Sequence, residues 1–181
     1  DTSDVFSDAT VVFPETNEFA ILQSAIHESW VRKQGSKLET RLRYTPTDCY
    51  ETFPFPIGEL DRSCDFCNLV DSMRRSIMTS DRIGLTQLYN KFHDPNVEDA
   101  RFEELRQLQV KIDNAVRDAY GWADLDLGHC FHKVGYLPEN DNIRFTISEP
   151  ARIEVLKRLA KLNKERWEEE EAAGLHKKGK K

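Results

Sequence analysis

The sequence predicts a predominantly helical α+β fold, in which the end of a mixed α/β domain is followed by a helical spacer with a short β element. Three observations predict it. Polar and apolar residues alternate over residues 38–44, apolar residues recur at helical spacing after residue 61, and prolines separate the two stretches near Pro56. The predicted units are 1–56, the helical tail 57–175 and a disordered lysine-rich end, 176–181.

In the first unit we expect a strand, a helix and a second strand. Residues 10–13 are expected to form the first strand. A helix over residues 17–34 is expected to end at Gly35, since glycine is common just after a helix. Its apolar stripe consists of Phe19, Leu22, Ile26 and Trp30.

The second strand is expected over residues 38–44. Side chains alternate between the two faces of a strand, so the sequence divides into a packed and a charged face. The packed face holds Leu38, Thr40, Leu42 and Tyr44, and the charged face holds Glu39, Arg41 and Arg43.

Residues 50–56 form a segment of aromatic residues spaced by prolines, which cannot be helical. We expect the phenylalanine rings to fill the core, because buried phenylalanine is far commoner than phenylalanine wedged between bases. A structural role in fixing the strand is therefore expected for Tyr50, Phe53, Pro54, Phe55 and Pro56.

The tail is expected to be helical because its apolar residues recur three and four positions apart. These positions are Phe66, Val70, Met73 and Ile77 in a first helix, Leu85, Leu88, Tyr89 and Phe92 in a second, and Phe102, Leu105, Ile112, Val116 and Ala119 in a third, which Gly121 should stop. Residues 143–147 are expected as a strand, followed by Ser148 as the N-cap of a last helix with Ile153, Leu156, Leu159 and Trp167.

Composition excludes some classes of protein. No apolar run approaches the roughly 18 residues needed to span a bilayer, so we expect no membrane. The first ten residues lack the basic start and apolar stretch of a signal peptide, which favours a cytoplasmic location. The net charge of −6 disfavours indiscriminate DNA binding, but residues 30–47 carry a local net charge of +4. A basic patch on an acidic body fits specific docking to DNA.

Glu39 and Arg41 carry the chemistry needed to read a C·G base pair. A glutamate accepts a hydrogen bond from cytosine N4, and an arginine donates two to guanine O6 and N7. Solvent-exposed strands with surface ion pairs contain the same residue types, so the spacing alone leaves open that these residues form an ordinary exposed strand face.

The run SKLETRLRYTPTDCYETFPFP resembles the end of the target recognition domain in type IIL restriction-modification enzymes, which methylate adenine N6 and cut DNA. The later runs AYGWADLDLGHCFH and RFTISEPARIEVLKRLAKLNKERWEEE are similar to the C-terminal tail of that group. The chain departs from the pattern at Cys64 and Cys67, and at Cys130, where glycine would be usual.

The resemblance implies that Glu39 and Arg41 choose one base pair of a double-stranded DNA target. It further implies an upstream methyltransferase domain in a longer parent chain used in phage defence, with S-adenosylmethionine as the parent's cofactor. Phosphate contacts beside the pair are expected from Arg32, Lys33, Lys37 and Arg43.

Two constellations suggest metal chemistry. Cys64 and Cys67 have C-x-x-C spacing and, with His129 and His132, offer four potential zinc ligands. Asp124 and Asp126 offer paired carboxylates for a metal-dependent nuclease. We expect no metal, because the two pairs lie far apart in sequence and a half-buried thiol is ordinary in a helix. A Cys130-based hydrolase is disfavoured, because neighbours in sequence seldom form a triad.

We expect no catalytic residue in this chain. The glycine-rich cofactor loop and the Asn-Pro-Pro-aromatic step of adenine-N6 methyltransferases are both missing from the sequence. The chain is therefore expected to be a recognition segment from the C-terminal part of a larger enzyme. The alternative is a free-standing acidic helical module that binds a protein partner.

Overall fold

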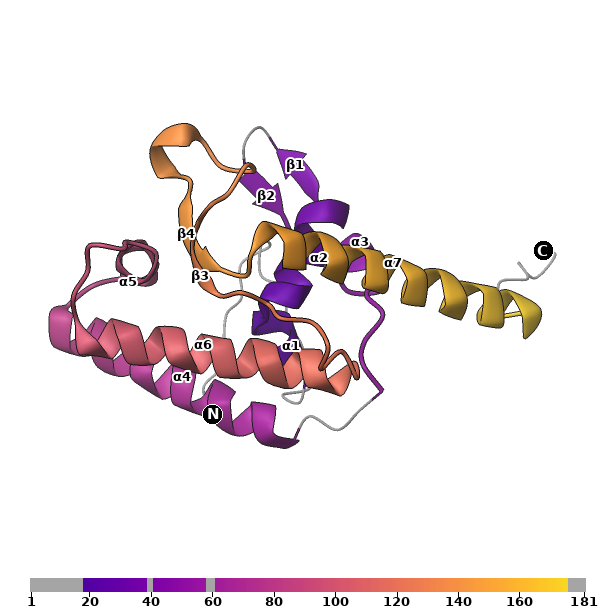
Figure 1. The fold of residues 1–181 in the computed structure, drawn as a ribbon, viewed down its shortest axis with the longest axis horizontal. Helices are drawn as coiled ribbons and strands as arrows, with labels where there is room; N and C mark the ends of the chain where they lie inside the picture. The colour runs from indigo at the N-terminus through magenta and orange to yellow at the C-terminus, as the bar shows by residue number, and fades with distance from the viewer. Residues whose placement is uncertain (1–17, 39–40, 58–60, 176–181) are drawn as a thin grey trace, which may run out of the picture.

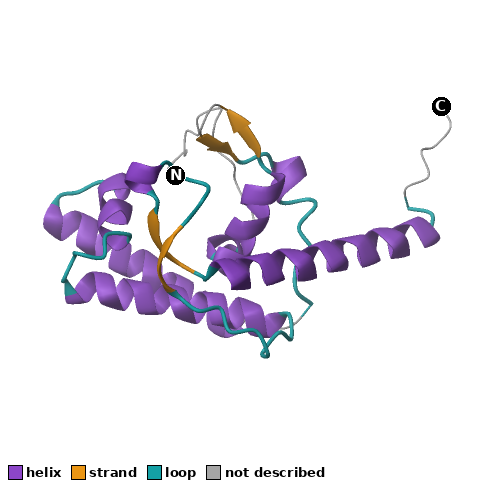
Figure 2. Ribbon diagram, turned by 45° about the horizontal axis from the view of Figure 1, so that its top comes forward, coloured by secondary structure: helices purple, strands orange, loops and turns teal. Residues whose placement is uncertain are grey.

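A computed structural model describes residues 18–38, 41–57 and 61–175, except for the side chains of 36–38, 41 and 61–64. Within these ranges the chain is predominantly helical, with two small antiparallel sheets, which confirms the predicted α+β class (Figures 1 and 2). The expected strand at 10–13 and the lysine-rich end at 176–181 lie outside the described residues.

The single helix predicted over residues 17–34 is wrong, because two helices occupy this stretch. They are α1, Phe19–Gln23, and α2, Ala25–Gln34, and Ser24 between them has an extended backbone. The Ser24 hydroxyl accepts a hydrogen bond from the His27 amide and donates one to the Ile21 carbonyl. Serine competes for backbone groups in this way, so it ends α1 and caps α2.

The turn at Ser24 also changes which residues are buried. Phe19, expected in the buried stripe, is 38% exposed, whereas Ile21 and Ile26 are almost fully buried. Gly35 ends α2 as expected.

The strand predicted over residues 38–44 is also wrong, because the chain reverses within it. The two strands β1, Ser36–Leu38, and β2, Arg41–Arg43, form an antiparallel hairpin that starts one residue after α2. Ser36 lies opposite Arg43, Lys37 opposite Leu42 and Leu38 opposite Arg41. Leu42, expected on a packed face, is 38% exposed. The predicted division of residues 38–44 into a packed and a charged face of one strand therefore does not apply.

A short helix, α3, Pro46–Cys49, follows the hairpin. It was not predicted, although proline at its first position has the backbone angle that a helix start requires. As predicted, no helix spans residues 50–56. The chain then enters α4, Asp61–Asp81.

The tail contains the helices that its periodicity predicts. They are α4, α5 (Leu85–Phe92), α6 (Ala100–Ala119) and α7 (Glu149–Ala172). Helices α4 and α6 lie side by side, and α7 extends beyond the rest of the molecule (Figure 1). Gly121, which follows the C-cap residue Tyr120 of α6, adopts a positive φ of 72°, and Ser148 caps α7.

Strand β4, Ile143–Thr146, matches the predicted strand to within one residue. Its partner β3, Cys130–Lys133, was not predicted. The connection between them contains a short 3-10 helix, η1, Glu139–Asp141.

One hydrophobic core joins the helices on both sides of Pro56. Ile21, Ile26 and Phe53 belong to the same buried cluster as Phe102 of α6 and Leu159 of α7. The domain boundary near residue 56 stays a prediction. The described residues on its two sides contribute to the same hydrophobic core. None of the described helices is long and apolar enough to cross a membrane.

Candidate nucleic-acid interface

Of the predicted base-reading pair, Arg41 belongs to β2. Glu39 lies outside the described residues. Arg41 belongs to the hairpin pair farthest from α2, and its side chain is not described. The Lys37 side chain is not described either. The structure thus places Arg41 and Lys37 on a hairpin close to the end of α2, and their contacts with DNA stay predictions.

The other three basic residues surround the base of the hairpin. Arg32 donates to Glu28 at 2.8 Å, and its guanidinium carbon lies 3.9 Å from the centre of the Tyr136 ring. These contacts hold Arg32 against the β3–β4 connection. Lys33 and Arg43 are exposed, and no ion pair joins either to a carboxylate of the described residues. Lys33 and Arg43 are therefore better placed than Arg32 to contact a phosphate.

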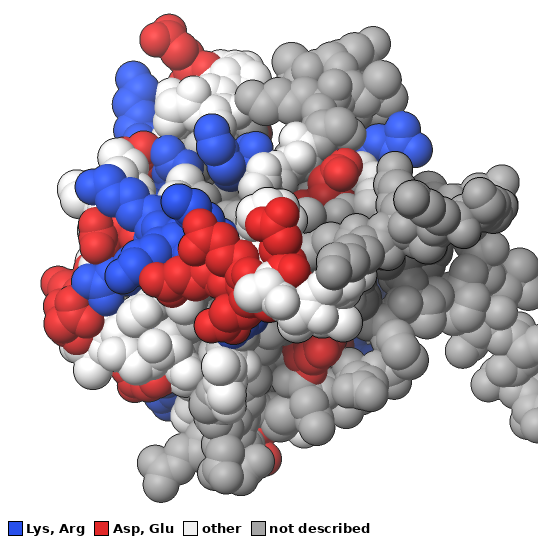
Figure 3. All heavy atoms as spheres, turned by 90° about the vertical axis from the view of Figure 1, so that its right-hand side faces the viewer, with Lys and Arg blue, Asp and Glu red and all other residues white. Residues whose placement is uncertain are grey.

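Charge on the α7 side of the molecule is mixed. In Figure 3, lysine and arginine side chains form a contiguous group bordered by aspartate and glutamate. Helix α7 itself carries charges of both signs, which form pairs such as Lys161–Glu165 and Lys164–Glu168. Adjacent charges of opposite sign weaken the attraction for phosphate, so this side is a poorer DNA surface than the base of the hairpin.

Tyr44, the residue after β2, is tied to α2. Its hydroxyl lies 3.2 Å from Nε2 of His27, which is 2% exposed. Burial lowers the pKa of His27 to about 4 and is the main cause that raises the pKa of Tyr44 to about 12. Both groups are therefore neutral near pH 7, and the contact is a hydrogen bond between uncharged partners.

The aromatic segment is held through its carbonyl groups. Within the segment the Tyr50 carbonyl accepts from the Phe53 amide and the Phe53 carbonyl from the Phe55 amide, whereas other carbonyls need donors from elsewhere. Asn163 donates to the Thr52 carbonyl at 2.6 Å, Arg166 to the Phe55 carbonyl at 2.7 Å and Tyr120 to the Pro54 carbonyl at 2.9 Å. We call Tyr120, Asn163 and Arg166 the carbonyl clamp.

The rings of the segment pack against each other and, through Phe53, against His27, Trp30 and Tyr120. Phe53 is 4% exposed, and its ring meets Phe55 edge to face at 5.0 Å. Tyr50 packs on Phe55 in the same way and donates a hydrogen bond to Glu18. Phe53 thus lies in the core rather than on a surface open to bases.

The acidic and histidine cluster of residues 124–132 is engaged within the fold. Arg158 donates two hydrogen bonds to Asp124, and the Gly128 amide donates to Asp126 at 3.0 Å. Nε2 of His129 lies 2.8 Å from Asp113, and Nε2 of His132 lies 2.8 Å from the Gly128 carbonyl. Arg158 lowers the pKa of Asp124 below its usual value.

Among the described residues, no three His, Cys, Asp or Glu side chains gather closely enough to hold a metal ion. Cys67 is buried in α4, and the Cys64 side chain is not described. Cys49 is buried and Cys130 is exposed, and neither forms a disulfide with another described residue.

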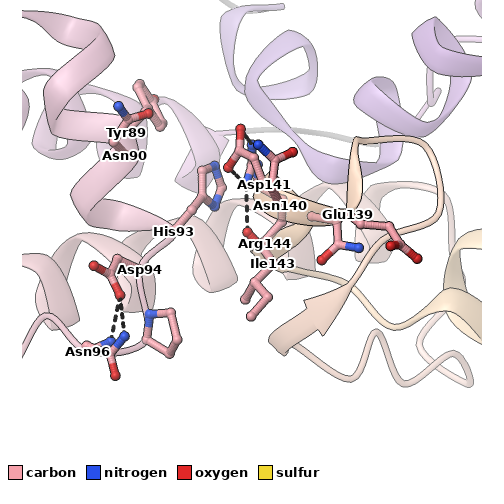
Figure 4. A pocket seen from close by; sticks show the side chains of 12 residues that line it. Tyr89, Asn90, His93, Asp94, Asn96, Glu139, Asn140, Asp141, Ile143 and Arg144 are labelled. Carbon is pink, nitrogen blue, oxygen red and sulfur yellow. Dashed lines mark hydrogen bonds and ion pairs between the residues drawn. The ribbon is translucent and has the colours of Figure 1, made fainter.

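A pocket with a volume of about 430 Å³ lies between α5 and the β3–β4 connection (Figure 4). Two pairs of its polar side chains are bonded to each other: Arg144 pairs with Asp141, and Asn96 donates to Asp94. His93 accepts a hydrogen bond from the Phe145 amide, and burial with the nearby Arg144 and Arg106 lowers its pKa to about 4. These hydrogen bonds give Arg144, Asp141 and His93 a structural role at the edge of the pocket.

Sequence reasoning missed the carbonyl clamp, His27 and Asp113. The clamp residues bond to positions 66 to 111 residues away, and no local pattern encodes such a contact. A clue to Asp113 was available, because this charged residue lies beside Ile112 on the apolar face of α6. Its carboxylate accepts from the Ala25 amide at 2.8 Å, from Gln109 at 3.1 Å and pairs with His129.

Comparison with known proteins places a similarity on the first part of the chain. Residues 1–57 match the family model described as MmeI, target recognition domain. No curated protein and no solved structure matches the chain. The matched residues include α1, α2, the β1–β2 hairpin, α3 and the aromatic segment. The match supports a target recognition domain of the restriction-modification type over residues 1–57.

Proposed function

We propose that this chain recognises a DNA sequence as part of a restriction-modification enzyme, with the β1–β2 hairpin as its reading element. The observation that carries the proposal is the match of residues 1–57 to a target recognition domain. The local charge supports it, because residues 30–47 are basic while the whole chain carries a net charge of −6.

Within the hairpin, Glu39 and Arg41 read one base pair. Their side chains are suited to cytosine N4 and to guanine O6 and N7. A two-stranded β-ribbon is narrow enough to enter the major groove, which supports this assignment. The pair formed by Leu38 and Arg41 is the described pair farthest from α2, so Arg41 belongs to the outer part of the hairpin.

Lys33, Arg43 and Lys37 contact phosphates, and Arg32 contributes from a fixed position. Lys33 and Arg43 flank the base of the hairpin and are exposed. Phosphate contacts position a protein on the duplex without reading sequence. Arg32 is held by Glu28 and Tyr136, so it offers phosphate a preorganised but partly neutralised charge.

The methylation chemistry belongs to a larger parent protein. In this proposal an upstream domain of the same parent chain binds S-adenosylmethionine and methylates adenine N6, and the parent acts in the cytoplasm in defence against phage. The resemblance of the FPFP and AYGW runs to type IIL enzymes supports it. Sequencing the DNA upstream of the Asp1 codon tests it: an open frame into an Asn-Pro-Pro-aromatic step agrees, and an in-frame stop followed by a start codon contradicts it.

A selection experiment tests the DNA-reading role. The 181-residue chain is incubated with a duplex library randomised at its centre, and the bound duplexes are sequenced. The proposal predicts an enriched common sequence. Recovery of a random set of duplexes, or of none, would contradict it.

Two charge substitutions test the phosphate contacts against the same selected duplex. Lys33→Gln and Arg43→Gln should weaken binding to all duplexes and lower the dependence of log K on log salt by about one unit each. Lys164→Gln, an exposed lysine of α7, is the matched control and should change neither quantity. A loss confined to the selected sequence would contradict a phosphate role.

A further inference from the structure

We propose that His27 is a positioning residue for DNA reading: through its hydrogen bond to Tyr44 it fixes the end of β2 against the helical core. The inference rests on the proposed function, because it concerns the hairpin that reads DNA. His27 lies in α2 and has no contact with DNA in this scheme, so it acts through another residue.

The first step is the contact between His27 and the hairpin. Nε2 of His27 lies 3.2 Å from the Tyr44 hydroxyl, and the two ring centres are 5.9 Å apart. Tyr44 directly follows Arg43, the last residue of β2, which lies opposite Ser36 at the start of β1. The hydrogen bond therefore acts at the end of β2 nearest to α2.

The second step is the contact between His27 and the core. The His27 ring meets the Phe53 ring edge to face at 4.6 Å, with an interplanar angle of 89°. Phe53 lies in the segment that Tyr120, Asn163 and Arg166 hold by its carbonyls. His27 is thus placed between the hairpin on one side and residues anchored to α6 and α7 on the other.

The third step is the cost of a histidine at this position. Its Nδ1 is buried and has no hydrogen-bond partner among the described residues. A buried polar atom without a partner is unfavourable, and an aliphatic side chain would avoid the penalty. The directional bond from Nε2 to Tyr44 gives a reason for a polar residue here, whereas filling space does not.

The experiment uses the 181-residue chain and the duplex selected from the randomised library. The measured quantity is the ratio of dissociation constants for a scrambled and the selected duplex. Tyr44→Phe and His27→Leu should each lower this ratio several-fold, and the double variant should lower it no further. His27→Gln, whose amide can reach Tyr44, should keep most of the ratio.

Tyr89→Phe is the matched control. The Tyr89 hydroxyl accepts a hydrogen bond from Arg74 at 2.9 Å, far in sequence from the hairpin. This variant loses one partly buried hydrogen bond, so its melting temperature should fall while its ratio of dissociation constants stays at the wild-type value. A purely structural role for Tyr44 would make the two tyrosine variants behave alike.

The outcomes separate the two proposals. If the wild-type chain prefers no sequence, the DNA-reading function fails and the positioning role fails with it. If the wild type prefers a sequence and Tyr44→Phe keeps that preference, the positioning role alone is overturned. Additive losses in the double variant would also overturn it, because the two side chains would then act separately. Tyr44→Phe removes a single oxygen, so it decides the question even if His27→Leu does not fold.

Discussion

Replacing Asp113 by alanine is expected to cost more stability than any other single aspartate replacement among the described residues. The Asp113 side chain is 1% exposed and joins α6 to the start of α2 and to the segment before β3. One carboxylate oxygen accepts from the Ala25 amide and from Gln109, and the other lies 2.8 Å from Nε2 of His129.

The magnitude follows from these contacts. In Asp113→Ala the Ala25 amide and the His129 ring both lose their partner in the interior. A buried donor left without a partner costs about 1–3 kcal/mol. The His129 side chain, which is 7% exposed, loses its hydrogen-bond partner as well, so the two losses together come to about 2–6 kcal/mol. We therefore expect the free energy of unfolding to fall by about 3–5 kcal/mol, within the range found for buried networks.

Urea denaturation measures this change, and Asp118→Ala is the matched control. Asp118 lies in the same helix, but its side chain is 55% exposed and pairs with the neighbouring Arg117. Exposed pairs contribute about 0–1 kcal/mol, so the control should lose little. Asp113→Asn should fall between the two, because its amide oxygen can still accept from Ala25. Equal losses for Asp113→Ala and Asp118→Ala would refute the role assigned to Asp113.

Three further predictions concern stability. Asn163→Ala and Arg166→Ala should each cost about 1–2 kcal/mol and speed amide hydrogen exchange at Phe53 and Phe55, because each removes a donor from a carbonyl of the aromatic segment. Lys164→Ala is the control, and unchanged exchange in the clamp variants would contradict the clamp. Gly35→Ala should destabilise the chain, since an added Cβ would lie 2.6 Å from the Val31 carbonyl oxygen. Gly135→Ala, whose added Cβ would meet nothing within 4 Å, should not, and equal melting temperatures for the two variants would contradict this close approach. Stability should fall as pH falls from 6.5 toward 4, because burial lowers the pKa of His27 and His93 to about 4 and the unfolded chain then binds more protons than the folded chain. His27→Gln should lower the slope of unfolding free energy against pH by about one proton in that window, and an unchanged slope would contradict a buried neutral His27.

The helices of the tail could be predicted because their pattern is local. The apolar residues of α4, α5 and α6 recur at the spacing of one helix face, and caps such as Ser148 mark the ends. Strand β3 was missed because its residues were interpreted as a possible metal or catalytic cluster. Its pairing with β4 depends on contacts that the local pattern does not contain.

The first part of the chain was harder to predict because two turns interrupt regular patterns. Ser24 divides a stretch with the apolar spacing of one helix, since its side chain satisfies backbone groups at the break. The alternation over residues 38–44 indicated a single strand, whereas the chain forms a hairpin. The contacts that hold this part, from His27 to Tyr44 and from Asn163 to Thr52, join distant positions and follow from the tertiary fold.

The most direct test of the account reverses the proposed reading pair. In the selection experiment, Glu39→Lys combined with Arg41→Asp should enrich a sequence that differs from the wild-type sequence at one base pair. The control reverses an exposed pair of α7, Lys161→Asp with Glu165→Lys, and should enrich the wild-type sequence. Enrichment of an unchanged sequence by the hairpin variant would contradict the assignment of Glu39 and Arg41 as base-reading residues.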